Sequence, residues 1–311
     1  MDKIPVIIDC DTGTDDAWAI VLANSSDKLD IRALTAVNGN VELKHTGPNN
    51  LNLREYLNID CRVALGADRP VIGGVNPIPD VHGENGLGGV ELPKAKRDFD
   101  EKYAWDVIAE EAERAAGELV ILAVGPLTNI AITFLKHPEA KKNIKRIVMM
   151  GGAFGTGNTN PYAEFNIWID PHACDIVFKS GVPITMVGLD ATRMTTLTGQ
   201  EQEALLAQPT KIDLLLRGMR KYFIESHKAM GRPDAVTLHD ALAVAAVIDP
   251  TVLHTEKYYV VCETKSSQSV GQTVVDFKGH LHREPNVDVA MSADKEKFVQ
   301  MLRACIACYA Q

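Results

Sequence analysis

Residues 6–20 read VIIDCDTGTDDAWAI and carry the strongest structural signal in the chain. The β-branched run at residues 6–8 is typical of a buried strand. Gly13 marks a tight turn, and the apolar residues beyond it recur at helical spacing, so we expect Thr14 or Asp15 to cap a helix. The stretch therefore predicts a strand, a turn and a helix.

Four carboxylates lie in and beside this turn, at Asp9, Asp11, Asp15 and Asp16. Like charges held this close raise one another's pKa unless a cation or a helix N-terminus neutralises them. Oxygen ligands favour calcium or magnesium over zinc. The alternative is that two of them cap a helix while the other two are solvated. Four carboxylates at the end of one buried strand favour the cation.

The composition is that of a globular protein with a small partner. The chain has 311 residues, 46% of them apolar, which is enough for a large core. Its 32 basic and 41 acidic residues give a net charge of −9, which argues against nucleic-acid and anionic-membrane partners. The N-terminus lacks a signal-like apolar region, and no apolar run approaches the roughly 18 residues of a membrane span. We therefore expect a cytoplasmic protein.

Strand-like runs alternate with helical patterns through the first two thirds of the chain. The predicted strands after the first are residues 31–37, 62–65, 118–124, 147–150 and 183–188, and the predicted helices are residues 48–57, 104–115, 130–135 and one that starts at Pro171. This alternation predicts βαβ crossovers and a mostly parallel, doubly wound central sheet in an α/β fold. No repeat or linker interrupts the pattern, so we expect a single domain over residues 1–311.

Beyond Gly199 the pattern changes to a helical and antiparallel extension. The predicted helices there are residues 200–207, 211–230, 241–248 and 298–309, and the strand-like runs are residues 258–263, 273–277 and 286–291. Between Gly66 and Pro93, by contrast, periodicity is lost in a segment rich in Gly, Pro and Asn. A loop this long is usually functional or disordered. Because it carries His82, we favour a lid over a solvated surface segment.

Leu238-His239-Asp240 precedes one of these helices. In isolation, Asp240 reads as a helix cap and His239 as a core histidine. Beside the aspartate cluster, Asp240 becomes a candidate ligand, since Asp11, Asp16, Asp240 and a backbone carbonyl supply about five of the roughly 6 to 8 oxygens that calcium takes. Such an incomplete set leaves room for water and substrate hydroxyls, as at a catalytic ion.

These residues bring out a family resemblance that covers nearly the whole chain. VIIDCDTGTDDA resembles the N-terminal aspartate motif of the nucleoside hydrolases, the inosine-uridine preferring nucleoside N-ribohydrolase family. Six later motifs match in order: Asn38-Gly39-Asn40, His82-Gly83, Gly125-Pro126-Leu127-Thr128-Asn129, Met150-Gly151-Gly152, Ala163-Glu164-Phe165-Asn166 and Leu238-His239-Asp240. The resemblance implies a nucleoside salvage enzyme that hydrolyses ribonucleosides to free base and ribose with one tightly bound calcium ion.

The resemblance also implies a role for each matched residue. The calcium ligands would be Asp11, Asp16, Asp240 and the carbonyl of Val124. The substrate-binding residues would be Asp15 and Asn166 at the ribose hydroxyls, Asn158 and Glu164 at the 5′-hydroxyl, Met150 and Phe165 around the sugar, and Phe223 and His227 at the base. The catalytic residues would be Asp11, His239, Asn40 near the attacked face, and His82 in the lid. Asp9 would only support the loop.

The chemistry gives Asp11 and His239 distinct tasks. Cleavage of an N-glycosidic bond passes through an oxocarbenium-like sugar, which a carboxylate-rich pocket stabilises. Calcium is a weaker Lewis acid than zinc, so a water bound to it still needs a base, and we assign Asp11. The nucleobase leaves more easily when protonated, and we assign His239 as the acid.

Three features of the sequence refine the resemblance. Thr12 stands where the family most often has Pro, which alters loop stiffness but leaves every carboxylate in place. By the same resemblance, His239, where another branch of the family carries Cys, points to the histidine-dependent branch. Phe223 and His227 lie one turn apart on a predicted helix, where aromatic side chains more often belong to the core.

Two alternatives stay open at this point. One is a haloacid-dehalogenase-like phosphatase, although Gly13 stands where that motif has Thr. The other is a calcium-dependent nucleoside or ribose binder without catalysis. The resemblance further implies a homotetramer or a homodimer.

Overall fold

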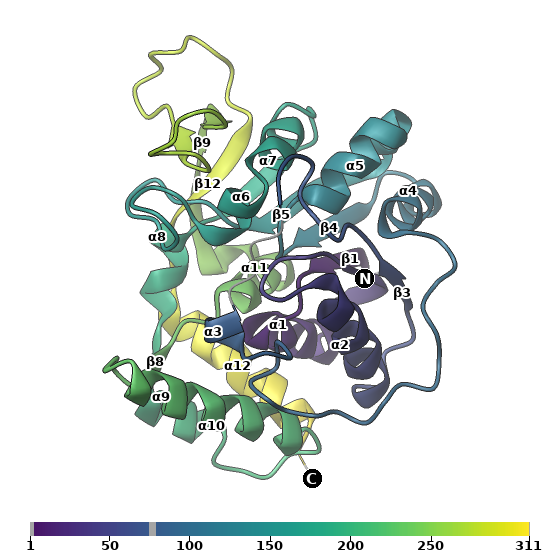
Figure 1. Ribbon diagram of the computed structural model, residues 1–311, viewed down its shortest axis with the longest axis vertical. Coiled ribbons are helices and arrows are strands. Elements are labelled where there is room, and N and C mark those ends of the chain that lie inside the picture. The colour runs from purple at the N-terminus through teal and green to yellow at the C-terminus, as the bar shows by residue number, and fades with distance from the viewer. Residues whose placement is uncertain (1–2, 75–78, 311) are drawn as a thin grey trace.

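Eight strands form one central sheet in the order β3-β2-β1-β4-β5-β6-β12-β9 (Figure 1). The structure is a computed structural model and describes residues 3–74 and 79–310. The strands of this sheet are β1 (Ile4–Cys10), β2 (Leu29–Ala36), β3 (Arg62–Leu65), β4 (Leu119–Ala123), β5 (Ile144–Met150), β6 (Ile184–Val187), β9 (Leu253–Tyr258) and β12 (Val287–Ala293). Each neighbouring pair is parallel except β12 and β9, which are antiparallel.

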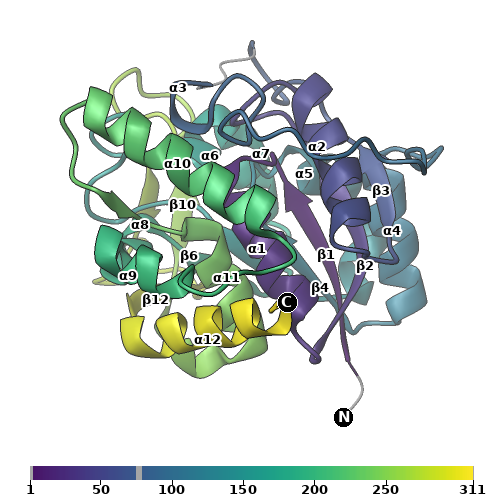
Figure 2. The ribbon, with the colours of Figure 1, turned by 90° about the horizontal axis from the view of Figure 1, so that it is seen from below.

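Helices cover both faces of the sheet, as expected for a doubly wound fold. One face carries α1 (Thr14–Ser25), α2 (Leu43–Tyr56), α9 (Gly199–Leu205), α10 (Asp213–Ala229), α11 (His239–Ile248) and α12 (Lys295–Cys308) (Figure 2). The other carries α4 (Ala104–Ala115), α5 (Thr128–Lys136) and α7 (Pro171–Phe178). The shorter elements are α3 (Pro79–His82), α6 (Phe165–Ile169), α8 (Leu189–Thr192), three 3₁₀ turns (Pro138–Asn143, Arg193–Thr195 and Pro250–Val252) and the strand pairs β7 (Leu197–Thr198) with β8 (Ala235–Val236) and β10 (Val260–Cys262) with β11 (Thr273–Val275).

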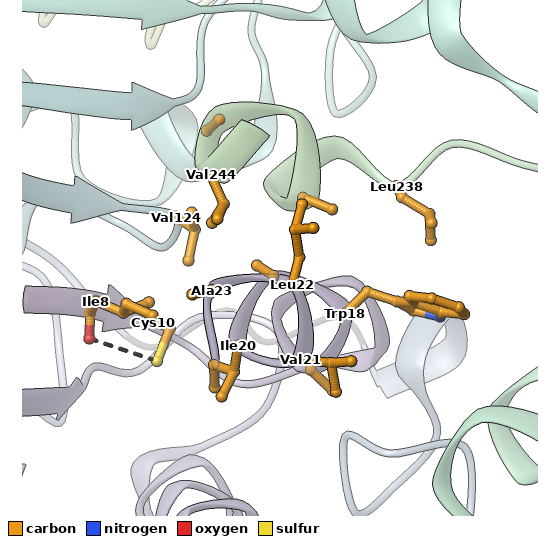
Figure 3. Packing of buried hydrophobic residues seen from close by; sticks show 14 of the residues in the cluster. Ile8, Cys10, Trp18, Ile20, Val21, Leu22, Ala23, Val124, Leu238 and Val244 are labelled. Atoms are coloured by element: carbon orange, nitrogen blue, oxygen red, sulfur yellow. Dashed lines mark hydrogen bonds between the residues drawn. The ribbon is translucent and has the colours of Figure 1, made fainter. Parts of the chain in front are cut away.

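The pleat of β1 explains why its residues are apolar on both sides. Val6 and Ile8 face the cluster under α1, whereas Ile7 faces the cluster under α5, and all three are fully buried. Helix α1 lies beside α11 on this face of the sheet, and the two helices pack closely against each other. Leu22 of α1 and Val244 of α11 belong to the same buried cluster, in which Val244 lies near Val124, and Trp18 lies near Leu238 at its edge (Figure 3). This packing fixes the turn that precedes α1.

The strand order reverses between β1 and β4. From β1 the chain moves outward through β2 to β3, then returns to β4 on the other side of β1 and continues through β5 and β6. In open α/β sheets, ligands bind in the crevice outside the carboxyl ends of the strands at such a switch point. The aspartate turn follows β1 and Val124 follows β4, so both lie at this point. The predicted α/β fold with a mostly parallel sheet is confirmed.

Several helix starts differ from the prediction, three of them informatively. The second helix was expected from Pro48, but α2 begins at Leu43, where the Glu42 carbonyl accepts from the amides of His45 and Thr46, and Pro48 lies inside the helix. Proline is common at the first helical position, which made it a misleading start signal. The last helix begins at Lys295 instead of residue 298. The cap of α1 is Gly13 instead of Thr14 or Asp15.

The C-terminal strands also differ from the prediction. The run expected over residues 258–263 breaks at Tyr259 into the end of β9 and β10, which pair with different partners. The run expected at residues 286–291 is β12, which joins the central sheet parallel to β6 and is not confined to an extension. Antiparallel pairing does occur, between β12 and β9 and between β10 and β11. Across residues 3–74 and 79–310, no helix combines the length and apolar character needed to cross a membrane.

Candidate active site

A cavity of about 390 Å³ opens beyond the carboxyl ends of the central strands. It is walled by the first turn of α1, the segments after β2, β4 and β5, α6, α10 and the start of α11. The predicted site residues in its lining are Asp15, Asn40, His82, Val124, Met150, Asn158, Glu164, Phe165, Asn166, Phe223, His227, His239 and Asp240. The structure thus brings segments between Thr14 and Asp240 to one cavity.

Asp11 and Asp16 lie directly behind the lining, where Asn40 connects them. The Asn40 amide donates to Asp11 Oδ2 (2.6 Å), and its side-chain Nδ2 donates to Asp16 Oδ2 (3.1 Å). Asp16 Oδ2 also accepts from the amide of Gly13 (2.8 Å), at the N-terminus of α1. Gly39 allows this approach, because a Cβ there would lie 2.0 Å from Asp11 Oδ2. The sequence Asn38-Gly39-Asn40 therefore serves the aspartate turn.

The carboxylates converge as ligands of a cation would. One ligand oxygen from each of Asp15, Asp16 and Asp240 lies within 4.8 Å of the others, and these three form the only such group found in the described part of the chain. Asp11, Asp15 and Asp16 each have a buried Oδ1 with no hydrogen-bond partner. Buried anionic oxygens without a partner are costly. The donor set, all oxygen, fits a hard divalent cation.

Burial raises the pKa of these carboxyl groups. The pKa of Asp16 rises to about 7, first through burial and then through the charge of Asp15. The pKa values of Asp11 and Asp240 are raised well above their ordinary range by burial, and next by Asp16 and Asp15 respectively. Without a cation, the folded protein therefore holds protons here at pH values where the unfolded chain has lost them.

The stability of the metal-free protein is expected to fall as pH rises. Because the pKa of Asp16 is about 7 in the folded protein and about 3.9 in an unfolded chain, its contribution is complete below about pH 4 and is lost as pH approaches about 7. Calorimetry of chelator-treated protein should show Tm falling over this range, and added calcium should raise Tm most near pH 7. Asp16→Asn should flatten the pH dependence, and an unchanged slope would contradict the assignment.

Glu164 and Asn166 are fixed by local structure at the far side of the cavity. Glu164 caps α6 and accepts from the amides of Asn166 (2.9 Å) and Gly152 (3.0 Å). Burial raises its pKa to about 7. Asn166 Nδ2 donates to the carbonyls of Val124 (2.9 Å) and Met150 (3.1 Å) and so joins the ends of β4 and β5. Asn158, in contrast, is exposed at the rim.

The two predicted histidines approach the aspartates from different elements. His82 lies in α3, and its Nδ1 accepts from the Thr14 amide (3.2 Å), 3.8 Å from Asp15 Oδ1. This bond leaves Nε2 as the protonated nitrogen of the neutral ring. His239 begins α11, and its Nδ1 lies 2.8 Å from Thr192 Oγ1. Burial lowers the pKa of both rings.

Asp9 and Thr12 hold the turn from behind. Asp9 Oδ1 accepts from Thr35 Oγ1 (2.5 Å) and Asn129 Nδ2 (2.8 Å), which ties β1 to β2 and α5. Thr12 Oγ1 donates to the side-chain oxygen of Asn50 in α2. This bond anchors the loop at the position where the family most often has proline.

The sequence pattern did not predict that the cavity has an apolar wall. It is formed by Trp18, Leu197, Leu205, Leu206, Leu216 and Met219, with Phe223 and His227 toward the opening. The rings of Phe223 and His227 are 4.5 Å apart, and both residues are half-buried. Periodicity predicts that one face of α10 is apolar, but the same pattern describes a helix packed on a core, so no sequence signal separates the two.

Comparison with known proteins gives one consistent result. The family model described as inosine-uridine preferring nucleoside hydrolase matches residues 6–300. Similar proteins are the pyrimidine-specific ribonucleoside hydrolases RihA of Escherichia coli (36% identical) and Shigella sonnei (37%), each aligned over 99% of both chains.

Two solved structures are similar over almost the whole chain. A plant nucleoside hydrolase has a TM-score of 0.92 at 32% identity and covers 97% of this chain and 99% of its own. A purine-preferring ribonucleoside hydrolase from Gardnerella vaginalis has a TM-score of 0.91 at 32% identity and covers 97% and 98%. These matches replace the phosphatase alternative and confirm the resemblance. The chain is a hydrolase that belongs to the inosine-uridine preferring nucleoside hydrolase family.

Proposed function

We propose that this protein hydrolyses the N-glycosidic bond of ribonucleosides to free base and ribose, with calcium as its resident ion. The observation that carries the proposal is the cluster of buried carboxylates with partnerless oxygens at one end of a cavity whose other end is apolar. A ribose with its hydroxyls suits the first end. A flat, weakly polar nucleobase suits the second.

The chain offers a ligand set for calcium and a set for the sugar. Asp11, Asp16, Asp240 and the Val124 carbonyl would hold the ion, and Asp15 is close enough to Asp16 and Asp240 to contribute. When bound, calcium would supply a positive charge that orders the ribose 2′- and 3′-hydroxyls and the attacking water. The remaining sugar contacts would come from Asp15, Asn40, Met150, Asn158, Glu164, Phe165 and Asn166.

The reaction needs a general base at one face of the sugar and a general acid beside the nucleobase. Asp11 would take the proton from the attacking water, because one of its oxygens is fixed by Asn40 and the other is free of partners. The surrounding carboxylates would stabilise positive charge at C1′ as the bond to the nucleobase breaks. His239 would donate a proton to the departing base, and His82 would assist from α3.

Free ribose should appear when the protein is incubated with uridine, cytidine, inosine or adenosine. The panel spans both base classes because the relatives include pyrimidine-specific and purine-preferring enzymes. A reducing-sugar assay measures the product, and elemental analysis of the purified protein measures calcium. A binder without catalysis would release no ribose. Protein that is active but free of calcium would contradict the choice of ion.

Nucleosides that lack the 2′-hydroxyl should be poor substrates. One hydrogen bond from this hydroxyl to a charged group would be lost, at a cost of about 1.5–3 kcal/mol, so kcat/KM for 2′-deoxyuridine should fall at least about tenfold relative to uridine. Equal values for the two would contradict binding of the ribose at the carboxylates. We further propose a cytoplasmic homodimer or homotetramer, which size-exclusion chromatography with light scattering would test for its assembly state.

A further inference from the structure

The hydroxyl of Thr192 lies against the ring of His239, at the rear of the cavity. Thr192 is the last residue of α8 and is fully buried. Its Oγ1 lies 2.8 Å from His239 Nδ1 and 3.4 Å from the Leu189 carbonyl in the preceding turn. The structure therefore gives His239 a buried neighbour of fixed position on the side away from the substrate.

The frame around Thr192 is rigid. The amide of Leu189 donates to the Gly152 carbonyl (2.9 Å), which holds α8 against the end of β5. A Cβ at Gly188 would lie 2.8 Å from the same carbonyl, so only glycine permits this approach. The Thr192 carbonyl accepts from Thr195 Oγ1 (2.8 Å) in the next turn. These contacts leave Thr192 little freedom to follow a moving ring.

The hydrogen bonds assign the nitrogens of His239. Thr192 has one hydroxyl proton and two lone pairs. When His239 is protonated on both nitrogens, its Nδ1–H donates to Thr192 Oγ1, and the hydroxyl proton of Thr192 is free to point to the Leu189 carbonyl, 3.4 Å away. His239 lines the cavity, and Nε2 is the nitrogen that remains for a substrate there. The bond made by one ring nitrogen thus decides which nitrogen faces the chemistry.

We propose that Thr192 is a positioning residue that holds the His239 ring with Nε2 toward the departing base. This inference rests on the proposed role of His239 as the acid. In that step His239 acts as the imidazolium, with a proton on each ring nitrogen. The Nε2 proton passes to the base as the C1′–N bond breaks with its electron pair going to the base nitrogen. Water adds its oxygen to C1′ and gives its proton to Asp11, and His239 is left as the neutral ring. The Nδ1–H bond to Thr192 stays intact throughout, so the ring does not turn while the proton leaves.

Thr192→Val removes the hydroxyl at nearly unchanged volume, and Thr192→Ser retains it. The valine variant should lower kcat for uridine by about ten- to a hundredfold, part of the contribution of a general acid, with little change in KM. It should change kcat for p-nitrophenyl riboside by less than about twofold, because that leaving group needs no proton. The serine variant should recover most of the loss. Thr133→Val is the matched control and should retain uridine turnover, because Thr133 is a fully buried threonine of α5 whose hydroxyl donates to the Asn129 carbonyl (2.8 Å) and which does not line the cavity.

A double-mutant cycle separates this inference from the proposed function. If Thr192 acts through His239, then Thr192→Val should have no further effect in a His239→Ala background. If the losses of kcat from Thr192→Val and His239→Ala multiply in the double variant, or if Thr192→Val slows both substrates equally, the positioning role is overturned while His239 remains the acid. If His239→Ala does not slow uridine hydrolysis more than hydrolysis of p-nitrophenyl riboside, His239 is not the acid, and the inference about Thr192 is then also wrong.

Discussion

Replacing Asp11 by alanine is expected to lower kcat for uridine by about a thousandfold or more. Asp11 is fully buried, and Asn40 fixes one of its oxygens while the other has no hydrogen-bond partner. A general base typically contributes 10²–10⁴-fold, and loss of a cation ligand adds to that. Steady-state kinetics at saturating calcium measures the effect.

Asp11→Asn separates the two causes, because it keeps an oxygen in place while removing the basic charge. We expect it to retain bound calcium in elemental analysis but to lose turnover nearly as fully as alanine. The matched control is Asp170→Asn. Asp170 is another fully buried aspartate, bonded to Thr128 Oγ1 (2.7 Å) and the Val71 amide (2.8 Å) and absent from the cavity lining. Near-normal kcat in Asp11→Ala would show that Asp11 is not the general base.

Replacing His239 by alanine should slow nucleosides by about 10²–10⁴-fold, the usual contribution of a general acid. Its ring lines the cavity beside the apolar wall, where a nucleobase would lie. The same variant should barely affect p-nitrophenyl riboside, whose leaving group departs without a proton. The ratio of kcat values for the two substrates is therefore the diagnostic measurement.

The histidine controls lie elsewhere in the fold. His137→Ala removes a half-buried ring that pairs with Asp106 (2.7 Å), outside the cavity, and should leave both substrates unaffected. Equal losses on nucleosides and on p-nitrophenyl riboside in His239→Ala would show that His239 holds the structure or the sugar and does not protonate the base.

Much of the fold could be predicted because its signals are local. The buried run in β1, the Gly13 turn and the apolar residues of α1 each follow from neighbouring residues, and the strand and helix alternation limits the topology to a parallel sheet. The errors came where local signals compete with distant partners. Pro48 looked like a helix start, and the run that ends β9 looked continuous, yet α2 starts earlier and the break at Tyr259 lets two strands pair with different partners.

Some residues of the site could likewise be predicted from local sequence, and others could not. Asp11, Asp15 and Asp16 could be assigned to one cluster because they share one turn. Asp240 was a candidate ligand because the aspartate cluster needs further oxygens, and the role of His239 came only from the family resemblance. Thr192 and the apolar wall had no sequence signal at all, because a buried threonine or leucine reads the same in a core and in a pocket.

The sequence by itself determined the chemistry of this protein, because the density of carboxylates in one turn is a property of neighbouring residues and demands a cation wherever the turn lies. The tertiary structure alone decided the geometry. Packing of α11 beside α1 on one face of the sheet brings an oxygen of Asp240 within 4.8 Å of those of Asp15 and Asp16. The hydrogen bond from α8 occupies Nδ1 of His239 and leaves Nε2 for the cavity. Such contacts join residues far apart in the chain, and long-range packing sets them.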